Sequence, residues 1–364
     1  MPDMDKDVSI ELQNAIGDRS VHRRTIVRAD SRQVHLYGYS QNRHPILQQD
    51  NEAIARGGER RWHPLRQEWN IYAAHRQNRT FKPASADNPL APTRPDGPAT
   101  EIPVIDFELA VFENKYSSLH FKAPAPKPGT PAKTAPAAGH CEVIVYGPEP
   151  TGNLYSIGQK KRRLLLAAWT DRYQEMFNMG CEYVLPFENR GEDVGVTLHH
   201  PHGQIYGFDY LPPAQFKAVD AFNSGYDLST EMRNWAKNYI VASAGNFSAY
   251  CPPFARFPFE VWIAPQSRKP GPWTFTDEDA DAFAYLIGDI TRRYDVYFDQ
   301  PTPYMFALHA APRSSQELYH FTAQFYPMMR APGQLKYLAS VEQHTGTFTV
   351  DVMPEAAAQI LKGC

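Results

Sequence analysis

The sequence predicts an α+β fold in which antiparallel sheets are flanked by helices. Short β-branched runs typical of strands are interspersed with long amphipathic patterns, without the regular strand–helix–strand order of parallel α/β proteins. A His-x-x-x-Gln-x-Tyr pattern at residues 200–206 also recurs at residues 320–326. Either two strands resemble each other by chance, or the chain is a duplicated fold with halves at 61–211 and 212–364.

The N-terminal residues 1–60 are polar and show little periodicity, so we interpret them as a loosely attached arm with one strand near 34–39. Regular patterns begin near residue 61. Residues 123–139 are rich in Pro and Ala and can bury little apolar surface. We therefore expect them to form an exposed loop.

Hydrophobic periodicity places the remaining elements. Gly180 is a natural end for the first long helix, and acidic residues open the helix that begins at 276, where they favour the helix dipole. The predicted helices cover 159–178, 214–238, 276–298 and 355–362. The predicted strands cover 68–73, 109–112, 141–146, 183–187, 194–198, 204–211, 259–264, 304–309 and 320–326.

Composition narrows the class of protein. The 364 residues are enough for about two domains, and a net charge of −3 gives no basic field for nucleic acid. The chain has no apolar run near 18 residues and no secretory signal pattern at its start, so we expect no membrane partner. The four cysteines are scattered without a CxxC pair, which is typical of a reducing cytoplasm. A cytoplasmic enzyme acting on a small molecule is the resulting expectation.

The densest chemical signal is the segment TLHHPHGQIY at 197–206. On a strand, alternate residues share a face, so His200, His202 and Gln204 are expected to project together. Gly203 between them is interpreted as room for the close approach of a ligand. A neutral imidazole can attack as a nucleophile once its other nitrogen is held by a neighbour. Two metal ligands, or two surface histidines, are the alternatives.

From about residue 61 onward, the chain resembles the galactose-1-phosphate uridylyltransferase family, the transferase branch of the histidine-triad superfamily. The resemblance rests on WHPLRQEWNIYAAHRQNR, VFENKYSSL, PFENRG, HPHGQ, FPFEVWIAP, HFTAQFYP and LKYLASVE. It implies a duplicated histidine-triad-like fold and a homodimer. It also implies a role in galactose metabolism, with ping-pong transfer of UMP from UDP-glucose to galactose-1-phosphate.

The resemblance assigns roles position by position. His202 matches the nucleophile that becomes uridylylated, His200 precedes it, and Gln204 matches a glutamine that contacts the transferred phosphate. Hydrolytic members carry a third histidine where this chain has Gln204, so the glutamine favours transfer over hydrolysis. The remaining matches are basic residues near the phosphates (Arg76, Arg79), nucleotide-site asparagines (Asn114, Asn189), a phosphate-holding hydroxyl (Thr197) and hexose-side residues (Lys336, Glu342).

Two other functions stay open at this point. A related nucleotidyltransferase or a sugar-nucleotide phosphorylase would keep His202 but use another base or sugar. A binding protein with a drifted site would bind UDP-sugars without exchanging phosphate.

The metal positions of the family look lost. Many members bind zinc through a CxxC, a later histidine and the first histidine of HPH, and here those positions read 88–91 (Asn-Pro-Leu-Ala), Pro150 and His200. A second, iron-type set of one glutamate and three histidines corresponds here to Ala218, His309, Thr322 and Gln324. We therefore expect no metal and no other cofactor.

Overall fold

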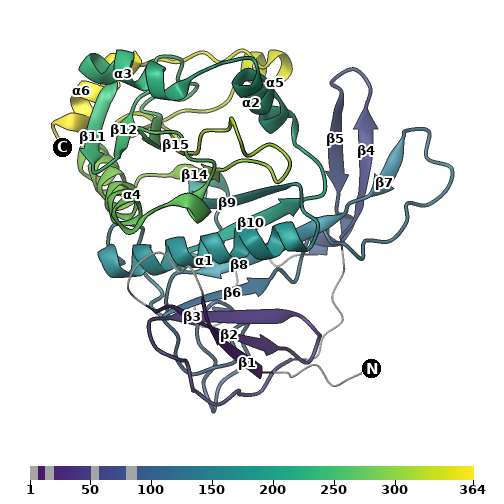
Figure 1. Cartoon of the computed structure of the whole chain (residues 1–364). Helices are drawn as coiled ribbons and strands as arrows, with labels where there is room; N and C mark the ends of the chain where they lie inside the picture. Colours follow the sequence, from purple (N-terminus) through teal and green to yellow (C-terminus); the bar gives the residue numbers. More distant parts are fainter. Residues whose placement is uncertain (1–6, 13–19, 51–56, 79–87) are drawn as a thin grey trace.

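The computed structural model describes residues 7–12, 20–50, 57–78 and 88–364. Its centre is a 12-stranded sheet ordered β1-β2-β3-β6-β8-β10-β9-β14-β15-β13-β12-β11, and each neighbouring pair is antiparallel (Figure 1). The strands are β1 (Asp7–Glu11), β2 (His22–Val27), β3 (Gln33–Gly38), β6 (Leu109–Glu113), β8 (Gly139–Val145), β9 (Tyr183–Arg190), β10 (His202–Phe208), β11 (Ile240–Ala244), β12 (Phe247–Tyr250), β13 (Val261–Pro265), β14 (Tyr304–His309) and β15 (Thr322–Pro327).

Two long helices, α1 (Gly158–Asn178) and α4 (Asp277–Phe298), lie side by side on one face of this sheet (Figure 1). Their apolar sides and the strands beneath them form the largest core cluster. The other helical elements are η1 (Ala74–Asn78), η2 (Glu192–Val194), α2 (Pro213–Asn223), α3 (Leu228–Tyr239), η3 (Pro272–Thr274), α5 (Ser340–Thr345) and α6 (Pro354–Lys362). This arrangement confirms the α+β prediction with antiparallel sheet and flanking helices.

The N-terminus of α4 is fixed by local sequence. Thr276 and Asp279 form a reciprocal capping box, with the Thr276 side chain accepting from the Asp279 backbone at 3.2 Å and the Asp279 carboxylate accepting from the Thr276 backbone at 2.9 Å. Arg162 on α1 then joins the two helices, because its buried guanidinium donates to the Ala284 carbonyl at 2.6 Å. Gly288 leaves the space for this guanidinium.

The two halves of the sheet mirror each other about the pair β9·β14. Gln204 on β10 lies opposite Phe187 of β9, and Phe187 in turn lies opposite Ala307 of β14. Ala307 lies opposite Gln324 of β15, so the two glutamines occupy equivalent places in one row across the sheet. Each half repeats a helix followed by two strands, with the second strand inserted next to an earlier one. The recurring sequence pattern therefore marks a duplicated fold.

The interpretation of residues 1–60 as a loosely attached arm with one strand was wrong for the described part. Three strands, β1 to β3, join the central sheet through β6. Polar contacts to α1 hold them, since Asp171 accepts from Arg23 at 2.8 Å and from the Tyr37 hydroxyl at 2.5 Å. These strands are hard to recognise in the sequence because they are rich in charged residues, and the buried partners of those residues are known only from the fold.

Several other predictions also need correction. The strand expected at 194–198 is instead the short helix η2 followed by an irregular segment, since Gly191 and Gly195 both have positive φ. The helix expected at 214–238 is broken at Gly225 into α2 and α3. Strands β11 and β12 and helix α5 were not anticipated.

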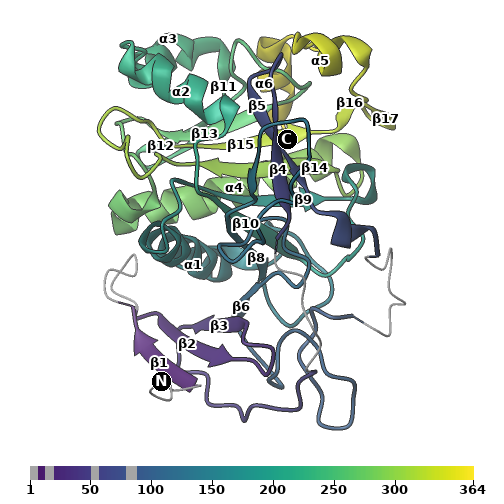
Figure 2. The same cartoon turned by 90° about the vertical axis from the view of Figure 1, so that its right-hand side faces the viewer.

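A separate three-stranded sheet, ordered β5-β4-β7, projects from the body of the molecule (Figures 1 and 2). It consists of β4 (Glu59–His63), β5 (Glu68–Tyr72) and β7 (Thr134–Pro136), and a further small sheet pairs β16 (Met329–Ala331) with β17 (Gln334–Leu335). Residues 124–131 of the Pro- and Ala-rich segment are mostly exposed, as expected, but the rest is largely half-buried and includes β7, which pairs with β4.

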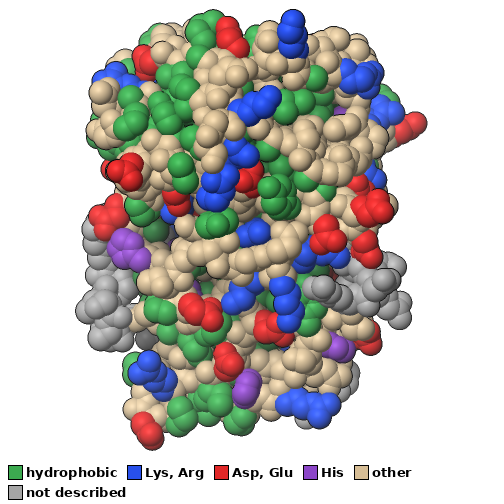
Figure 3. Space-filling model, turned by 90° about the vertical axis from the view of Figure 1, so that its left-hand side faces the viewer, with side chains coloured by type: hydrophobic (Ala, Val, Ile, Leu, Met, Phe, Trp, Pro, Cys, Tyr) green, Lys and Arg blue, Asp and Glu red, His purple; other side chains and the backbone are tan. Residues whose placement is uncertain are grey.

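Among the described residues, no helix is both long enough and apolar enough to cross a membrane. On the face drawn in Figure 3, acidic and basic side chains lie intermixed, so this face carries no uniformly basic surface.

Candidate functional site

A cavity of about 340 Å³ opens where β9 ends and β10 begins. It brings together Asn189, His200 and His202, three of the residues that the sequence singled out. The residues that line it are Gly152, Asn153, Glu188, Asn189, Arg190, Gly191, Val196, Leu198, His199, His200, Pro201, His202 and Pro301.

The two histidines of the HPH motif have different environments. His202 is half-buried at the first position of β10, and its Nδ1 lies 2.7 Å from the His200 carbonyl oxygen. Because a carbonyl only accepts, Nδ1 carries the proton and Nε2 carries the lone pair. His200 is 3% exposed, and its Nε2 donates to the Gly147 carbonyl at 2.7 Å. Its Nδ1 lies 2.9 Å from the Asn88 amide nitrogen.

These contacts assign different tasks to the two rings. Burial lowers the pKa of His200, and both of its ring nitrogens are hydrogen-bonded within the protein. His200 is therefore held by the protein at both ring nitrogens, and its backbone carbonyl contacts Nδ1 of His202.

Further along β10, Gln204 and Tyr206 share the face of His202, opposite the helix-facing Ile205. The Gln204 side chain makes no hydrogen bond within the described part of the chain, so its amide is available to a ligand. Arg76 lies 3.4 Å from the Tyr206 hydroxyl. Tyr206 follows His202 by four residues, about 14 Å along an extended strand, so Arg76 contacts the far end of this face.

Gly203 does not have the role that its place in the motif indicated. A Cβ at Gly203 would meet the Phe187 carbonyl oxygen at 2.7 Å and the Tyr146 hydroxyl at 2.9 Å. The missing side chain therefore makes room for β9 and Tyr146 on the buried side, and the prediction that it admits a ligand was wrong.

Glu188 is a buried residue of the cavity wall that was missed by sequence reasoning. It accepts from the Tyr146 hydroxyl at 2.6 Å and from the Tyr304 hydroxyl at 2.8 Å. Burial raises its pKa, although both hydroxyls oppose this effect. The signal for it was present, because the triplet Phe-Glu-Asn occurs at both 112–114 and 187–189.

Other wall groups are fixed by ion pairing. Arg190 binds Asp295 of α4 through two bonds of 2.7 and 2.9 Å, and Asp295 also accepts from the Asn153 amide at 3.3 Å. Because both Asp295 oxygens bind it, the Arg190 guanidinium is held in place as part of the cavity wall.

The remaining site predictions are spread over the molecule. Thr197 is half-buried between two cavity-lining residues but does not itself line the cavity. Asn114 directly follows β6, and its Oδ1 accepts from the Tyr116 backbone at 2.9 Å; its own backbone bonds to Cys141, the partner of Tyr206. Arg79 lies outside the described residues.

Lys336 and Glu342 form a separate cluster. The Lys336 ammonium lies 3.2 Å from the Glu342 carboxylate and donates to the Thr349 carbonyl at 2.9 Å. The Thr349 hydroxyl is the main cause that lowers the pKa of Glu342 to about 2. Lys336 lines another cavity of about 480 Å³, with no residue in common with the cavity at His202.

The donors at the zinc-like position do not fit a metal ion. His200 has both ring nitrogens engaged, and the neighbour at Nδ1 is the amide nitrogen of Asn88, which is not a metal ligand. Across the described ranges, no group of three or more His, Cys, Asp or Glu side chains is arranged to hold a metal.

The iron-like position is likewise filled by neutral groups. His309 Nδ1 lies 2.7 Å from the Gln215 amide nitrogen and 3.2 Å from the Tyr183 hydroxyl, and burial lowers the pKa of His309 to about 4. Thr322 accepts from the Gln324 amide at 2.9 Å. His309 thus bonds to Gln215 and Tyr183, and Thr322 bonds to Gln324. The position lacks the carboxylate and the further imidazoles that a metal would need.

Comparisons with known proteins agree with this geometry. The N-terminal domain model of galactose-1-phosphate uridyl transferase matches residues 47–212, and the C-terminal domain model matches 222–362. A galactose-1-phosphate uridylyltransferase of Thermotoga maritima is 33% identical over 317 residues, covering 84% of this chain and 98% of the relative.

Solved structures show the same fold. A uridylyltransferase structure has a TM-score of 0.74 at 26% identity, covering 84% of this chain and 97% of that one. An ADP-glucose phosphorylase from Arabidopsis thaliana has a TM-score of 0.64 at 21% identity, covering 84% and 98%, a likeness of fold alone.

Proposed function

Because the chain belongs to the galactose-1-phosphate uridyl transferase family, we propose that it moves UMP from UDP-glucose to galactose-1-phosphate through a covalent bond to His202. The observation that carries this proposal is the 2.7 Å contact from His202 Nδ1 to the His200 carbonyl. It fixes the tautomer whose Nε2 lone pair is a nucleophile, on a residue that lines an open cavity.

In the first half-reaction, the Nε2 lone pair of His202 attacks the α-phosphorus of UDP-glucose. The bond from this phosphorus to the bridging oxygen breaks, and glucose-1-phosphate leaves with the electron pair. Nδ1 keeps its proton, so the uridylylated ring is positively charged and the His200 carbonyl offsets that charge.

In the second half-reaction, a phosphate oxygen of galactose-1-phosphate attacks the same phosphorus. The phosphorus–nitrogen bond breaks, its electron pair returns to Nε2, and UDP-galactose is released. Both leaving groups are good enough to depart without a general acid. A neutral amide at Gln204 therefore suffices to hold the phosphate oxygens, and it activates no water.

We propose that the chain acts as a homodimer. Lys336 and Glu342 match hexose-side residues of the family, but Lys336 lines a cavity separate from that of His202, and the Glu342 carboxylate lies 3.2 Å from its ammonium. A second copy would bring one cavity to the other. Mixing His202→Ala and Lys336→Met proteins under subunit exchange should restore part of the activity, whereas no recovery in a monomeric protein would contradict this arrangement.

We further propose a protein that works without a metal, in the cytoplasm and without nucleic acid. The support is the amide at Nδ1 of His200 and four free cysteines, three of them buried. Stoichiometric zinc or iron in chelator-washed, active protein would contradict the first of these.

Isotope exchange tests the proposed reaction. Labelled glucose-1-phosphate should enter UDP-glucose in the absence of galactose-1-phosphate, because a covalent intermediate allows each half-reaction to run alone. The same exchange should be lost in His202→Ala. Exchange into ADP-glucose but not UDP-glucose, or product formation only with inorganic phosphate as acceptor, would instead identify a sugar-nucleotide phosphorylase.

A further inference from the structure

Asn88 contacts the catalytic motif from a distant part of the chain, and the direction of its side chain is fixed. Its Oδ1 accepts from the Leu90 backbone at 3.0 Å, so its amide nitrogen is the group that faces His200 Nδ1 at 2.9 Å. A flipped amide would place Oδ1 against Nδ1 and lose both bonds. The Asn88 amide is therefore a donor to Nδ1.

This bond determines the state of the His200 ring. With Nδ1 accepting, the single ring proton is on Nε2, which donates to the Gly147 carbonyl at 2.7 Å. The ring is thus held at both nitrogens, between the loop at Asn88 and Gly147, two residues after β8. The backbone carbonyl of His200 in turn accepts from Nδ1 of His202 at 2.7 Å.

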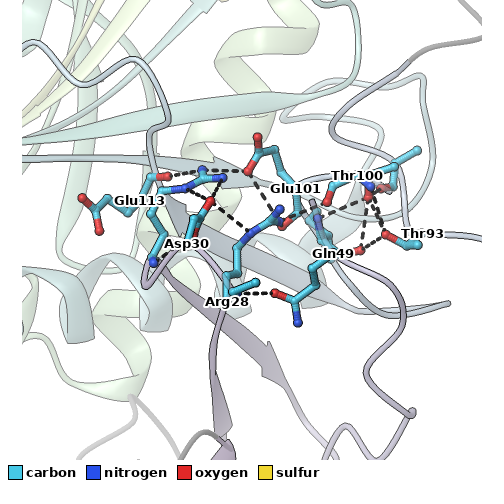
Figure 4. Close-up of polar contacts among 11 residues, drawn as sticks. Arg28, Asp30, Gln49, Thr93, Thr100, Glu101 and Glu113 are labelled. Atoms are coloured by element: carbon cyan, nitrogen blue, oxygen red, sulfur yellow. Dashed lines mark hydrogen bonds and ion pairs between the residues drawn. The ribbon is translucent and has the colours of Figure 1, made fainter. Parts of the chain in front are cut away.

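The loop that carries Asn88 is linked to the N-terminal strands through residues Thr100 and Glu101, whose polar contacts Figure 4 shows. Arg28 at the end of β2 donates to the Thr100 and Glu101 carbonyls at 3.0 and 2.5 Å. Arg32 binds the Glu101 carboxylate at 2.7 Å and Asp30 at 2.8 Å, and both arginines are buried. The Glu101 backbone then donates to the carbonyl of Pro89, the neighbour of Asn88, at 3.0 Å.

The strands β1 to β3 that supply these arginines lie outside the residues that match the family model, which begin at 47. The hairpin between β2 and β3 nevertheless contacts the loop behind the candidate site.

We propose that Asn88 is a positioning residue for the nucleophile: its amide holds the His200 ring, the His200 carbonyl holds His202, and the β2–β3 hairpin holds the loop of Asn88. The role deepens the proposed function and rests on His202 as nucleophile. The hydrogen bond from the Asn88 amide to His200 Nδ1 lies at the zinc-like position, where the side chains do not fit a metal ion.

The test uses Asn88→Asp and Asn88→Ser. Both replacements keep an oxygen that accepts from the Leu90 backbone, so the turn is retained. An ionised aspartate has no donor for His200 Nδ1, and the serine hydroxyl is one bond shorter than the asparagine amide that reaches this nitrogen. The serine also adds no charge. Asn42→Asp is the matched control, since Asn42 also caps its own turn, at His44, and donates its amide to the Asp106 carbonyl, far from the motif.

Two quantities are measured for each protein. One is the single-turnover rate at which the full-length enzyme acquires UMP from saturating UDP-glucose, together with the dissociation constant of UDP-glucose. The other is the ¹⁵N resonance of His200 Nδ1 in histidine-labelled protein, identified by its absence in His200→Gln.

Both Asn88 variants should acquire UMP roughly 10- to 100-fold more slowly, with a dissociation constant within about two-fold of the wild type, because the nucleophile is misplaced while the binding surface remains. The Nδ1 resonance should shift in both variants and stay in place in Asn42→Asp. Rates equal to that of Asn42→Asp, weaker binding at an unchanged rate, or a slower rate with an unshifted Nδ1 would overturn the proposal.

Failure of the proposed function gives a different result. Wild-type protein that turns over without ever acquiring UMP would overturn the role of His202, and the role of Asn88 with it. Normal UMP acquisition in the Asn88 variants would overturn the role of Asn88 alone.

Discussion

The two halves of the sheet contain equivalent strands, β10 and β15, whose polar side chains have different hydrogen-bond partners. The motif His200, His202, Gln204 leads into β10, and the equivalent places before and on β15 hold His320, Thr322 and Gln324. The first histidine behaves alike in both, since His200 Nε2 donates to the Gly147 carbonyl at 2.7 Å and His320 Nε2 donates to the Pro265 carbonyl at 2.8 Å.

The difference lies in the next two places. Gln324 donates to Thr322, and its Oε1 accepts from the Tyr326 hydroxyl at 2.5 Å, so the polar groups of β15 satisfy one another. Gln204 has no such partner among the described residues, and His202 lines the cavity. The comparison distinguishes two kinds of residue. The first histidine, present in both halves, bonds to a backbone carbonyl, whereas His202 lines the cavity and has no histidine counterpart on β15.

The largest expected effect comes from the position at which the halves differ most. His202→Ala should lower UMP transfer by about 10⁴-fold or more, since the covalent route is lost. The matched variant Thr322→Ala should leave the transfer rate within about two-fold and lower the unfolding free energy by about 1 kcal/mol. Steady-state transfer and urea unfolding measure both, and comparable rate losses in the two variants would break the comparison.

The glutamines give the next effect. Gln204→Ala should slow transfer by about 10- to 100-fold, through loss of a donor to the phosphate oxygens. Gln324→Ala removes contacts only within β15, so it should change stability and leave the transfer rate essentially intact. A transfer rate that depends equally on Gln324 would show that β15 also contacts substrate.

The position between histidine and glutamine tests packing. Gly203→Ala should cost about 1–3 kcal/mol of stability, because the new Cβ meets the Phe187 carbonyl and the Tyr146 hydroxyl. Its equivalent on β15 is Ala323, which is fully buried, and Ala323→Gly should cost about 1 kcal/mol or less. Thermal unfolding compares them, and a Gly203→Ala protein as stable as the wild type would refute the close approach.

The last expected effect concerns pH and leaves the transfer rate at neutral pH unchanged. Burial lowers the pKa of His320 from 6.5 to about 4. As pH falls below 6.5, the unfolded chain binds a proton at His320 that the folded chain refuses, so the contribution of His320 to folding stability falls until about pH 4. Above pH 6.5 the group is neutral in both states and the effect is absent.

His320→Asn removes this titration. As the pH falls from 6 to 4.5, the wild type should therefore lose up to about 1.4 kcal/mol of unfolding free energy per pH unit relative to the variant. Urea midpoints across this range measure the difference. A difference that does not vary with pH would mean that the His320 ring takes up its proton in the folded protein.

The sequence predicted the parts of this molecule that depend on local pattern. The long helices, the strand at 304–309 and the mirrored motif followed from periodicity and from the recurrence of His, Gln and Tyr. The contacts of Asn88 and Glu188 could not be predicted in the same way, because each depends on partners more than 40 residues away.

The N-terminal strands escaped prediction for a related physical reason. Their arginines are typical of an exposed surface, and only the fold shows that Arg28 and Arg32 are buried against Glu101 and backbone carbonyls. Gly203 was read as an opening toward substrate, since the pattern cannot tell which face of the strand the neighbouring strand crowds.

The site of covalent attachment tests the central claim most directly. The protein is incubated with UDP-glucose alone, quenched under alkaline conditions that preserve phosphorus–nitrogen bonds, digested and mapped by mass spectrometry. The account predicts one UMP group on His202, absent from the β15 peptide and removed by galactose-1-phosphate. An active protein that carries no UMP, or carries it on another residue, would contradict it.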